Sequence, residues 1–216
     1  MKYNYDTVAA WYDRLQRLVF GNALVNAQLY LLQAIPQGAH ILIAGGGTGA
    51  ILEEITRLHP GGLTITFADT SEKMTALARN RNTGDNKVTF FAAPVETVLV
   101  NEQYDVVLTP FLFDNFTDEV MKHTFSMMDQ HLTKGGIWLY CDFVNSKLMW
   151  QRLLLKSMYL FFRLMSGVKA SHLPDAEGCF KQHNYTVTAR QYFYKGFVTA
   201  VVFKKEGAPT GNPDMV

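Results

Sequence analysis

Residues 40–50 read HILIAGGGTGA, an uncharged apolar run that leads directly into four glycines within five positions. The following residues, ILEEITRL, carry apolar side chains at the three- and four-residue spacing of an amphipathic helix. Glycine lets a chain turn sharply at the end of a buried strand and leaves its backbone open to a ligand. The stretch therefore predicts a strand, a ligand-binding turn and the N-terminus of a helix.

The same alternation continues along the chain. We expect strands at 40–44, 63–68, 87–92, 104–109 and 136–143, and helices at 49–59, 71–81 and 117–132, the last followed by a turn at TKGG (133–136). Such repetition favours right-handed crossovers and a mostly parallel, doubly wound sheet with helices on both faces. The last two strands, 185–194 and 196–205, are too close for a crossover and predict an antiparallel hairpin. The predicted fold is a seven-stranded α/β fold.

The length of 216 residues and the 48% apolar content favour a single domain, which we place at residues 1–206. Within it, residues 1–35 are expected to form N-terminal cap helices with a break at Gly21, and residues 145–183 a helical insert between strands five and six. Residues 207–216 are expected to be a disordered tail.

The composition argues against several classes of protein. A formal net charge of +1 without a block of either sign predicts no nucleic-acid partner. The two cysteines, Cys141 and Cys179, lie in no metal-binding pattern, so no metal site is expected. The chain shows no signal-peptide plan and no run of 18 apolar residues, which predicts a cytoplasmic protein without stable membrane insertion. Both a monomer and a homodimer remain open.

An acidic residue follows the second predicted strand at the distance that a nucleoside-binding site needs. Asp69 lies 24 positions after Gly45 and is placed to accept hydrogen bonds from ribose hydroxyls. The glycines fit two patterns. Gly45-x-Gly47-x-x-Ala50 fits a dinucleotide turn, and Gly45-x-Gly47-x-Gly49 fits a turn that binds S-adenosylmethionine (SAM). The residues that follow discriminate between them.

Over about residues 5–205 the sequence resembles the class I, Rossmann-like SAM-dependent methyltransferases. ILIAGGGTGAILEEI (41–55) is similar to their first motif, FADTSEKMTALAR (67–79) to the acidic strand end and next helix, and YDVVLTPFLFDNF (104–116) to the fourth strand and its loop. LTKGGIWLYCDF (132–143) is similar to their fifth strand, and YDTVAAWYDRL (5–15) to the cap of quinone-biosynthesis methyltransferases. A dehydrogenase explains the glycines but none of these later matches.

The resemblance implies an enzyme that takes a methyl group from SAM and releases S-adenosylhomocysteine. The glycine turn would hold the methionine part, Asp69 the ribose and the loop 94–96 the adenine, while the cap helix closes over the ligand. The implied cofactor-binding residues are Tyr12, Ala44, Gly45, Gly46, Gly47, Gly49, Asp69, Thr70, Pro94, Val95, Glu96 and Thr109.

Two positions depart from the family pattern. Ile43 stands where the first strand usually carries an acid that helps to hold the amino end of SAM, and Pro94 stands where an Asp often faces adenine. A hydrogen bond to a charged group contributes about 1.5–3 kcal/mol, so the loss of the acid corresponds to one or two decades in affinity. A catalytically inactive SAM-binding protein is therefore one alternative, and a small NAD(P)-dependent oxidoreductase is another.

Methyl transfer needs the donor and the acceptor to be aligned in a pocket that excludes water. It needs a general base only where the accepting atom carries a proton of high pKa. Asp114, after the fourth strand, and Asp142, at the end of the fifth, are the candidate catalytic residues. Each has a simpler interpretation. Asp114 would belong to the loop before a helix, and Asp142 would satisfy backbone groups where the chain leaves the sheet.

The segment KLMWQRLLLKSMYLFFRLM (147–165) predicts a helix with one narrow basic strip and a broad apolar remainder. Its apolar face needs a partner, which we expect to be the cap helix, a second subunit, or an apolar substrate or membrane surface. Aromatic side chains near it predict a small apolar or aromatic acceptor. The candidate substrate residues are Phe111, Phe113, Asn115, Tyr159 and Phe162.

Overall fold

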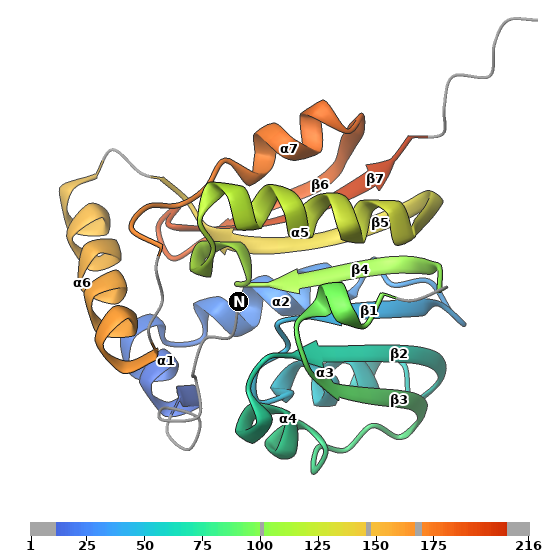
Figure 1. The fold of residues 1–216 in the computed structure, drawn as a ribbon. Helices are drawn as coiled ribbons and strands as arrows, with labels where there is room; N and C mark the ends of the chain where they lie inside the picture. The colour runs from blue at the N-terminus through green and yellow to red at the C-terminus, as the bar shows by residue number, and fades with distance from the viewer. Residues whose placement is uncertain (1–11, 100–101, 146–147, 167–169, 207–216) are drawn as a thin grey trace, which may run out of the picture.

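The computed structural model describes residues 12–99, 102–145, 148–166 and 170–206. Seven strands form one sheet in the order β3-β2-β1-β4-β5-β7-β6 (Figure 1). They are β1 (His40–Ala44), β2 (Gly61–Asp69), β3 (Asp85–Ala92), β4 (Tyr104–Pro110), β5 (Leu132–Phe143), β6 (Tyr185–Phe193) and β7 (Val198–Lys205). Strands β1 to β5 pair in parallel, whereas β7 runs antiparallel to both β5 and β6. The predicted α/β fold and its closing hairpin are confirmed.

Seven α-helices and two short 3-10 helices connect these strands within the described ranges. They are α1 (Tyr12–Phe20), α2 (Ala23–Leu32), α3 (Ala50–Leu58), α4 (Glu72–Ala78), η2 (Val95–Thr97), η3 (Phe113–Asn115), α5 (Asp118–His131), α6 (Met149–Ser166) and α7 (Ala176–Gln182). Local chemistry sets several ends. Gly21, with φ +59°, separates α1 from α2 as predicted. The Ser71 hydroxyl begins α4 by accepting a hydrogen bond from Met74 N at 3.1 Å.

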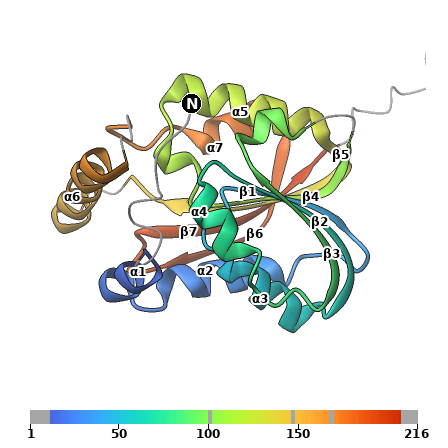
Figure 2. The same ribbon diagram turned by 60° about the horizontal axis from the view of Figure 1, so that its bottom comes forward.

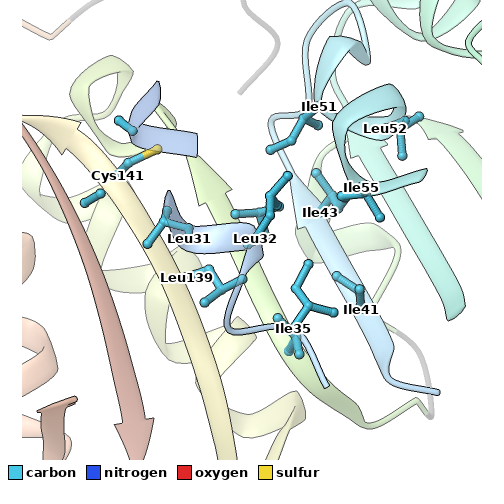
Figure 3. Close-up of a cluster of buried hydrophobic side chains, with 14 of the residues drawn as sticks. Leu31, Leu32, Ile35, Ile41, Ile43, Ile51, Leu52, Ile55, Leu139 and Cys141 are labelled. Carbon is cyan, nitrogen blue, oxygen red and sulfur yellow. The ribbon is translucent and has the colours of Figure 1, made fainter. Parts of the chain in front are cut away.

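Helices cover both faces of the sheet (Figure 2). The α2 and α3 side encloses a hydrophobic core that includes Ile41 and Ile43 of β1 (Figure 3). The α5 and α7 side encloses a second core, to which β1 contributes Leu42 and Ala44. Successive strand residues point to opposite faces, so a strand buried on both sides must be apolar throughout. This explains the uncharged first strand.

One predicted turn is wrong. Residues 133–136 lie inside β5, which begins at Leu132. Leu132 pairs with Tyr104 and Ile137 pairs with Val106, so the extra residues of β5 form a bulge against β4. Gly135, at φ +77°, gives the bulge its backbone conformation. Pairing with a neighbouring strand has overridden the local turn signal.

The fold places loops from several strands at one end of the sheet. Strands β1 and β4 are neighbours, yet their following helices, α3 and α5, cover opposite faces (Figure 2). Ligands bind at such a reversal, outside the carboxyl ends of the strands. Helices α1 and α6 lie at this end of the molecule (Figure 1). Residues 1–11 of the expected cap and the tail 207–216 lie outside the described residues. Within the described ranges, every helix is too short or too polar to cross a membrane.

Candidate active site

Two adjoining cavities lie at the carboxyl ends of the parallel strands. The glycine cavity, of about 310 Å³, is lined by the turn after β1 and by the ends of β2 and β3. The apolar cavity, of about 320 Å³, is lined mainly by α1, α6 and the loop after β4. Gln16, Leu24, Phe111 and Asn115 line both. The two cavities therefore share a wall that one short loop and the first two helices build.

The turn after β1 is tied to the turn after β2 by a carboxylate. Gly47 N donates a hydrogen bond to Asp69 Oδ2 at 2.9 Å, and Ser71 N donates to Asp69 Oδ1 at 2.9 Å. Gly47 has φ +58°, a conformation that favours glycine, and a Cβ there would meet no atom within 4 Å. The backbone conformation, and not crowding, is therefore what requires glycine at this position.

Gly49 has a different role from the glycines that line the cavity. A Cβ at Gly49 would lie 2.6 Å from the Ala78 Cβ of α4, so the absence of a side chain lets α3 pack closely against α4. Gly45, Gly46 and Gly47 line the glycine cavity, whereas Gly49 does not. Its contribution is to fix the N-terminus of α3 beside the cavity.

Arg81 supports the glycine turn from α4's side, and the sequence pattern did not indicate this. Its Nε donates to the Thr48 carbonyl at 3.0 Å, and its Nη1 lies 3.5 Å from a Glu53 carboxylate oxygen. An arginine just after a helix is an ordinary helix-end cation in the linear sequence. Only the fold brings it to a turn 33 residues earlier in the chain.

The loop after β3 forms the far wall of the glycine cavity. Pro94, Val95 and Glu96 of this loop line the cavity, as does Thr70, which follows β2. Glu96 is held from α5, because the Thr124 hydroxyl donates a hydrogen bond to Glu96 Oε1. The wall is thus apolar at Pro94 and Val95 and acidic at Glu96.

The position that lacks the family acid points away from the glycine cavity. Ile43 is fully buried in the core under α3, where it lies beside Ile55 (Figure 3). Its neighbour Ala44 lines the cavity instead. Thr109 is buried and accepts a hydrogen bond from Trp138 Nε1 at 2.9 Å, and it does not line the cavity. The side chain of Tyr12 lies outside the description.

Polar side chains from the first two helices reach the glycine cavity. Gln16 and Arg17 of α1 and Gln28 of α2 line it. Sequence reasoning missed all three, because polar residues on an amphipathic helix are usually solvent-facing.

The loop between β4 and α5 separates the cavities in a strained conformation. Phe111 has φ +54°, which is uncommon for a side chain of this size. Two hydrogen bonds hold it there: Phe111 N donates to the Cys141 carbonyl at 2.9 Å, and Asn115 Nδ2 donates to the Phe111 carbonyl at 3.1 Å. Backbone strain that the surroundings enforce tends to occur at functional sites.

A pair of carboxyl groups adjoins this loop. Asp114 lines the apolar cavity, whereas Asp142 is buried behind it. Asp142 Oδ2 accepts from Asp114 N at 3.2 Å, and its Oδ1 accepts from Phe143 N at 2.8 Å. Burial, and next the charge of Asp142, raise the pKa of Asp114 well above its usual range, and burial raises the pKa of Asp142 to about 7.

Comparison with known proteins agrees with this geometry. Residues 41–136 match the family described as methyltransferase domain. The malonyl-[acyl-carrier protein] O-methyltransferase of Bacillus cereus is 35% identical over 105 residues, which are 48% of this chain and 37% of that protein. The similarity to a methyltransferase domain covers less than half of the chain.

Two further proteins, both methyltransferases by name, are similar to this chain over a greater part of its length. The ubiquinone/menaquinone biosynthesis C-methyltransferase UbiE of Geobacter sulfurreducens is 27% identical over 184 residues, 82% of this chain and 67% of that protein. The N-methyltransferase NodS of Bradyrhizobium japonicum, solved with S-adenosylhomocysteine, has a TM-score of 0.66 at 14% identity, covering 87% of this chain and 88% of that one. The latter shows the class I methyltransferase fold. The match to the first relatives covers little more than a third of their length.

The structure separates the five predicted substrate residues into two groups. Phe111, Asn115 and Phe162 line the apolar cavity. Phe113 instead lies in the core, its ring centroid 6.3 Å from that of Trp138, and Tyr159 is buried beside Ala170. Neither of these two lines a cavity, because the 3-10 turn and the phase of α6 rotate them away from it. The sequence did not indicate several other residues that line the apolar cavity, namely Leu15, Val19, Phe20, Leu154, Met158 and Phe161.

Proposed function

We propose that this protein is a SAM-dependent methyltransferase that holds SAM in the glycine cavity and a small, apolar or aromatic acceptor in the apolar cavity. One observation carries the proposal: the two cavities adjoin and share Phe111 and Asn115. Methyl transfer is a direct displacement, so donor and acceptor must meet across one opening with the reacting atoms aligned. Two cavities of similar volume that share lining residues would place donor and acceptor side by side.

The residues of the glycine cavity fit SAM. The turn leaves its backbone open where the N-terminus of α3 begins, which suits the carboxylate of the methionine part. Asp69 lies at the end of β2, where the ribose hydroxyls would lie. Pro94 and Val95 offer an apolar surface to the adenine ring. The ammonium group would be left to Gln16, Gln28 and backbone carbonyls, because Ile43 is buried in the core.

SAM, when bound, supplies a methyl group that its positive sulfur already activates. The chain then has to align the acceptor and exclude water. Phe111 and Leu24 at the shared wall provide apolar surface, and Asn115, whose amide also bonds the Phe111 carbonyl, keeps that wall in place. Helices α1 and α6 cover the apolar cavity from outside.

The lining of the apolar cavity favours an acceptor that is mostly apolar. Among the described residues that line it, the polar ones are Gln16, Asp114, Asn115 and Ser157, and none is Lys, Arg or His. A carboxylate acceptor, such as the malonyl group named for the Bacillus cereus relative, would meet no cation among these residues. An aromatic ring, as the name of the Geobacter sulfurreducens relative suggests, would meet Phe111, Phe161 and Phe162.

We assign to Asp114 one of two roles: it accepts a proton from the acceptor, or it orients the acceptor. Its carboxyl faces the apolar cavity, and its raised pKa makes it a stronger base than an ordinary aspartate. Asp142 is a positioning residue, because it holds the backbone of Asp114 and lines neither cavity.

A thermal-shift comparison tests the donor half of the proposal. A ligand that binds only the folded state raises the melting temperature, so SAM and S-adenosylhomocysteine should raise it and NADH should not. A shift with NADH alone would instead indicate an oxidoreductase.

Transfer of a labelled methyl group to a library of phenols, quinols and apolar amines tests the acceptor half. Product with any of them supports the proposal. Tight binding of S-adenosylhomocysteine without product from the whole library would indicate a SAM-binding protein without catalysis, the alternative that the buried Ile43 favours.

A further inference from the structure

We propose that the outward face of α6 docks this protein onto the surface of an anionic membrane. The face, called here the α6 outer face, consists of an aliphatic stripe and an adjacent basic stripe. The aliphatic stripe is Met149, Leu153, Leu160 and Leu164, and the basic stripe is Arg152, Lys156 and Arg163.

The aliphatic stripe is unusually exposed. Met149 is 79% exposed, Leu153 71%, Leu160 59% and Leu164 76%. Single exposed leucines are common on protein surfaces, but these four follow one another at steps of four and seven residues and so lie in one row along the helix. A row of exposed aliphatic side chains marks an interaction surface.

The basic stripe indicates which partner fits. Arg152, Lys156 and Arg163 are exposed and repeat at the same four- and seven-residue steps, so they run beside the aliphatic row. Helix α6 contains no Asp or Glu. The whole chain has 20 basic and 19 acidic residues, so an unbalanced group of three cations is a local feature of this face. Lipid phosphates complement the cations, and the acyl boundary accepts the aliphatic side chains.

Helix α1 also carries exposed apolar and basic side chains at this end of the molecule. Leu18 is 84% exposed, and Arg14 is exposed on the same helix. Helices α1 and α6 lie at the same end of the molecule in both views, and both line the apolar cavity (Figures 1 and 2). Sequence alone offers only the narrow basic strip of one helix, whereas the fold adds a second basic helix at the same end.

A second copy of the chain fits this surface less well. A symmetric contact between two α6 outer faces would bring cations toward cations, with no acid on either helix to pair with them. The buried face of α6 has a different task, because Leu154, Met158, Phe161 and Phe162 line the apolar cavity. Docking would therefore place the roof of that cavity against lipid.

Sedimentation with lipid vesicles tests the proposal without any assay of methyl transfer. The wild-type protein is mixed with vesicles of phosphatidylcholine containing phosphatidylglycerol, and with vesicles of phosphatidylcholine alone. We expect binding to the first and much weaker binding to the second. The variant R152Q/K156Q/R163Q should lower the partition coefficient roughly 100-fold, since each cation near an anionic surface contributes about fivefold. The variant L153S/L160S/L164S should lower it at least about 10-fold.

A matched control uses three exposed cations at the opposite end of the sheet. Lys87, Lys134 and Lys204 lie near the amino ends of β3 and β5 and near the end of the antiparallel β7. The variant K87Q/K134Q/K204Q makes the same change in charge and should alter binding by less than about threefold. Circular dichroism and the melting temperature establish that each variant is folded.

Three results would overturn the proposal. One is no binding of the wild-type protein to the anionic vesicles, and another is an equal loss in the control variant, which would mean unspecific attraction. The third is a dimer, measured by light scattering, that L153S/L160S/L164S splits while vesicles bind neither protein. That result would assign the α6 outer face to a second copy.

Discussion

The glycine cavity and the apolar cavity adjoin, yet they are built in different ways. The first is lined by the turns that follow β1, β2 and β3, which lie close together in the sequence, and by residues of α1 and α2. The second is lined by side chains of α1, α6 and the loop after β4, which together span more than 100 residues of the chain. Under the proposed function, local turns would hold the ligand common to the family, while the helices placed over them would select the acceptor.

The largest effect that this contrast predicts is at Ile43. An acid there would restore the family pattern in sequence, but the Ile43 side chain is buried in the core under α3 (Figure 3). Ile43→Asp should lower the free energy of unfolding by about 3–5 kcal/mol, because it buries an unpaired charge. Denaturant unfolding measures the loss. Ile43→Val, as the control, should cost about 1 kcal/mol.

The opposite result at Ile43 would contradict the proposed difference between the glycine cavity and the apolar cavity. If Ile43→Asp kept the wild-type unfolding midpoint and bound S-adenosylhomocysteine more tightly, the side chain would reach the ligand. The glycine cavity would then depend on side chains as much as the apolar cavity does.

The second prediction concerns the carboxylate that joins two turns. Asp69→Ala removes the acceptor of the Gly47 and Ser71 backbone hydrogen bonds, and with it the expected ribose contact. The affinity for S-adenosylhomocysteine should fall roughly 100-fold, which corresponds to about 2.7 kcal/mol. Isothermal titration calorimetry measures it. Asp85→Ala, an exposed acid at the start of β3, should leave the affinity unchanged, and an unchanged affinity in Asp69→Ala would mean that the ribose lies elsewhere.

The third prediction concerns how the stability of the protein depends on pH through the carboxyl pair beside the apolar cavity. Both Asp114 and Asp142 have a pKa raised by burial, that of Asp142 to about 7. The folded protein therefore binds more protons than the unfolded chain between the ordinary Asp pKa and about 7, so stability is highest on the acid side and falls as the pH rises through this window.

Denaturant unfolding at pH 5 and pH 8 should show a fall of about 2 kcal/mol in the free energy of unfolding. Asp114→Asn should flatten this dependence, because it removes one of the two carboxyl groups, whose pKa is raised by burial and next by the charge of Asp142. Asp85→Asn, exposed and remote, serves as the control. A stability that rises with pH in the wild-type protein would show that the carboxyl pair ionises freely when folded.

The sequence predicted the glycine cavity better than the apolar one for a physical reason. Glycines at a strand end and an acid at the end of the next strand act through backbone turns, which neighbouring residues determine. Gly47 and Asp69 accordingly lie where the pattern places them, at the turn after β1 and the end of β2. Their contacts with a ligand stay a prediction.

Packing between residues that are distant in the sequence decides which of the predicted aromatic residues line the apolar cavity. Phe111 and Phe113 are two residues apart, yet a positive φ and a 3-10 turn send one to the cavity wall and the other into the core. Likewise Phe162 lines the cavity while Tyr159, one turn away on α6, is buried without a hydrogen-bond partner for its hydroxyl among the described residues. A helix pattern gives the spacing of such residues but not the rotation at which the helix docks.

The smallest expected effect separates the two cavities most directly. Met158 lines only the apolar cavity, so Met158→Trp should fill part of that space and leave the glycine turn untouched. The affinity for S-adenosylhomocysteine should stay within about twofold, while kcat/KM for an acceptor found in the library should fall about 10-fold, as expected for one misfit group in an apolar pocket. Leu164→Trp on the exposed side of the same helix controls for the bulk of the indole. If both variants lost the same activity, α6 would act through its stability and not through the cavity, whereas a loss confined to Met158→Trp shows that the helix over the site selects the acceptor.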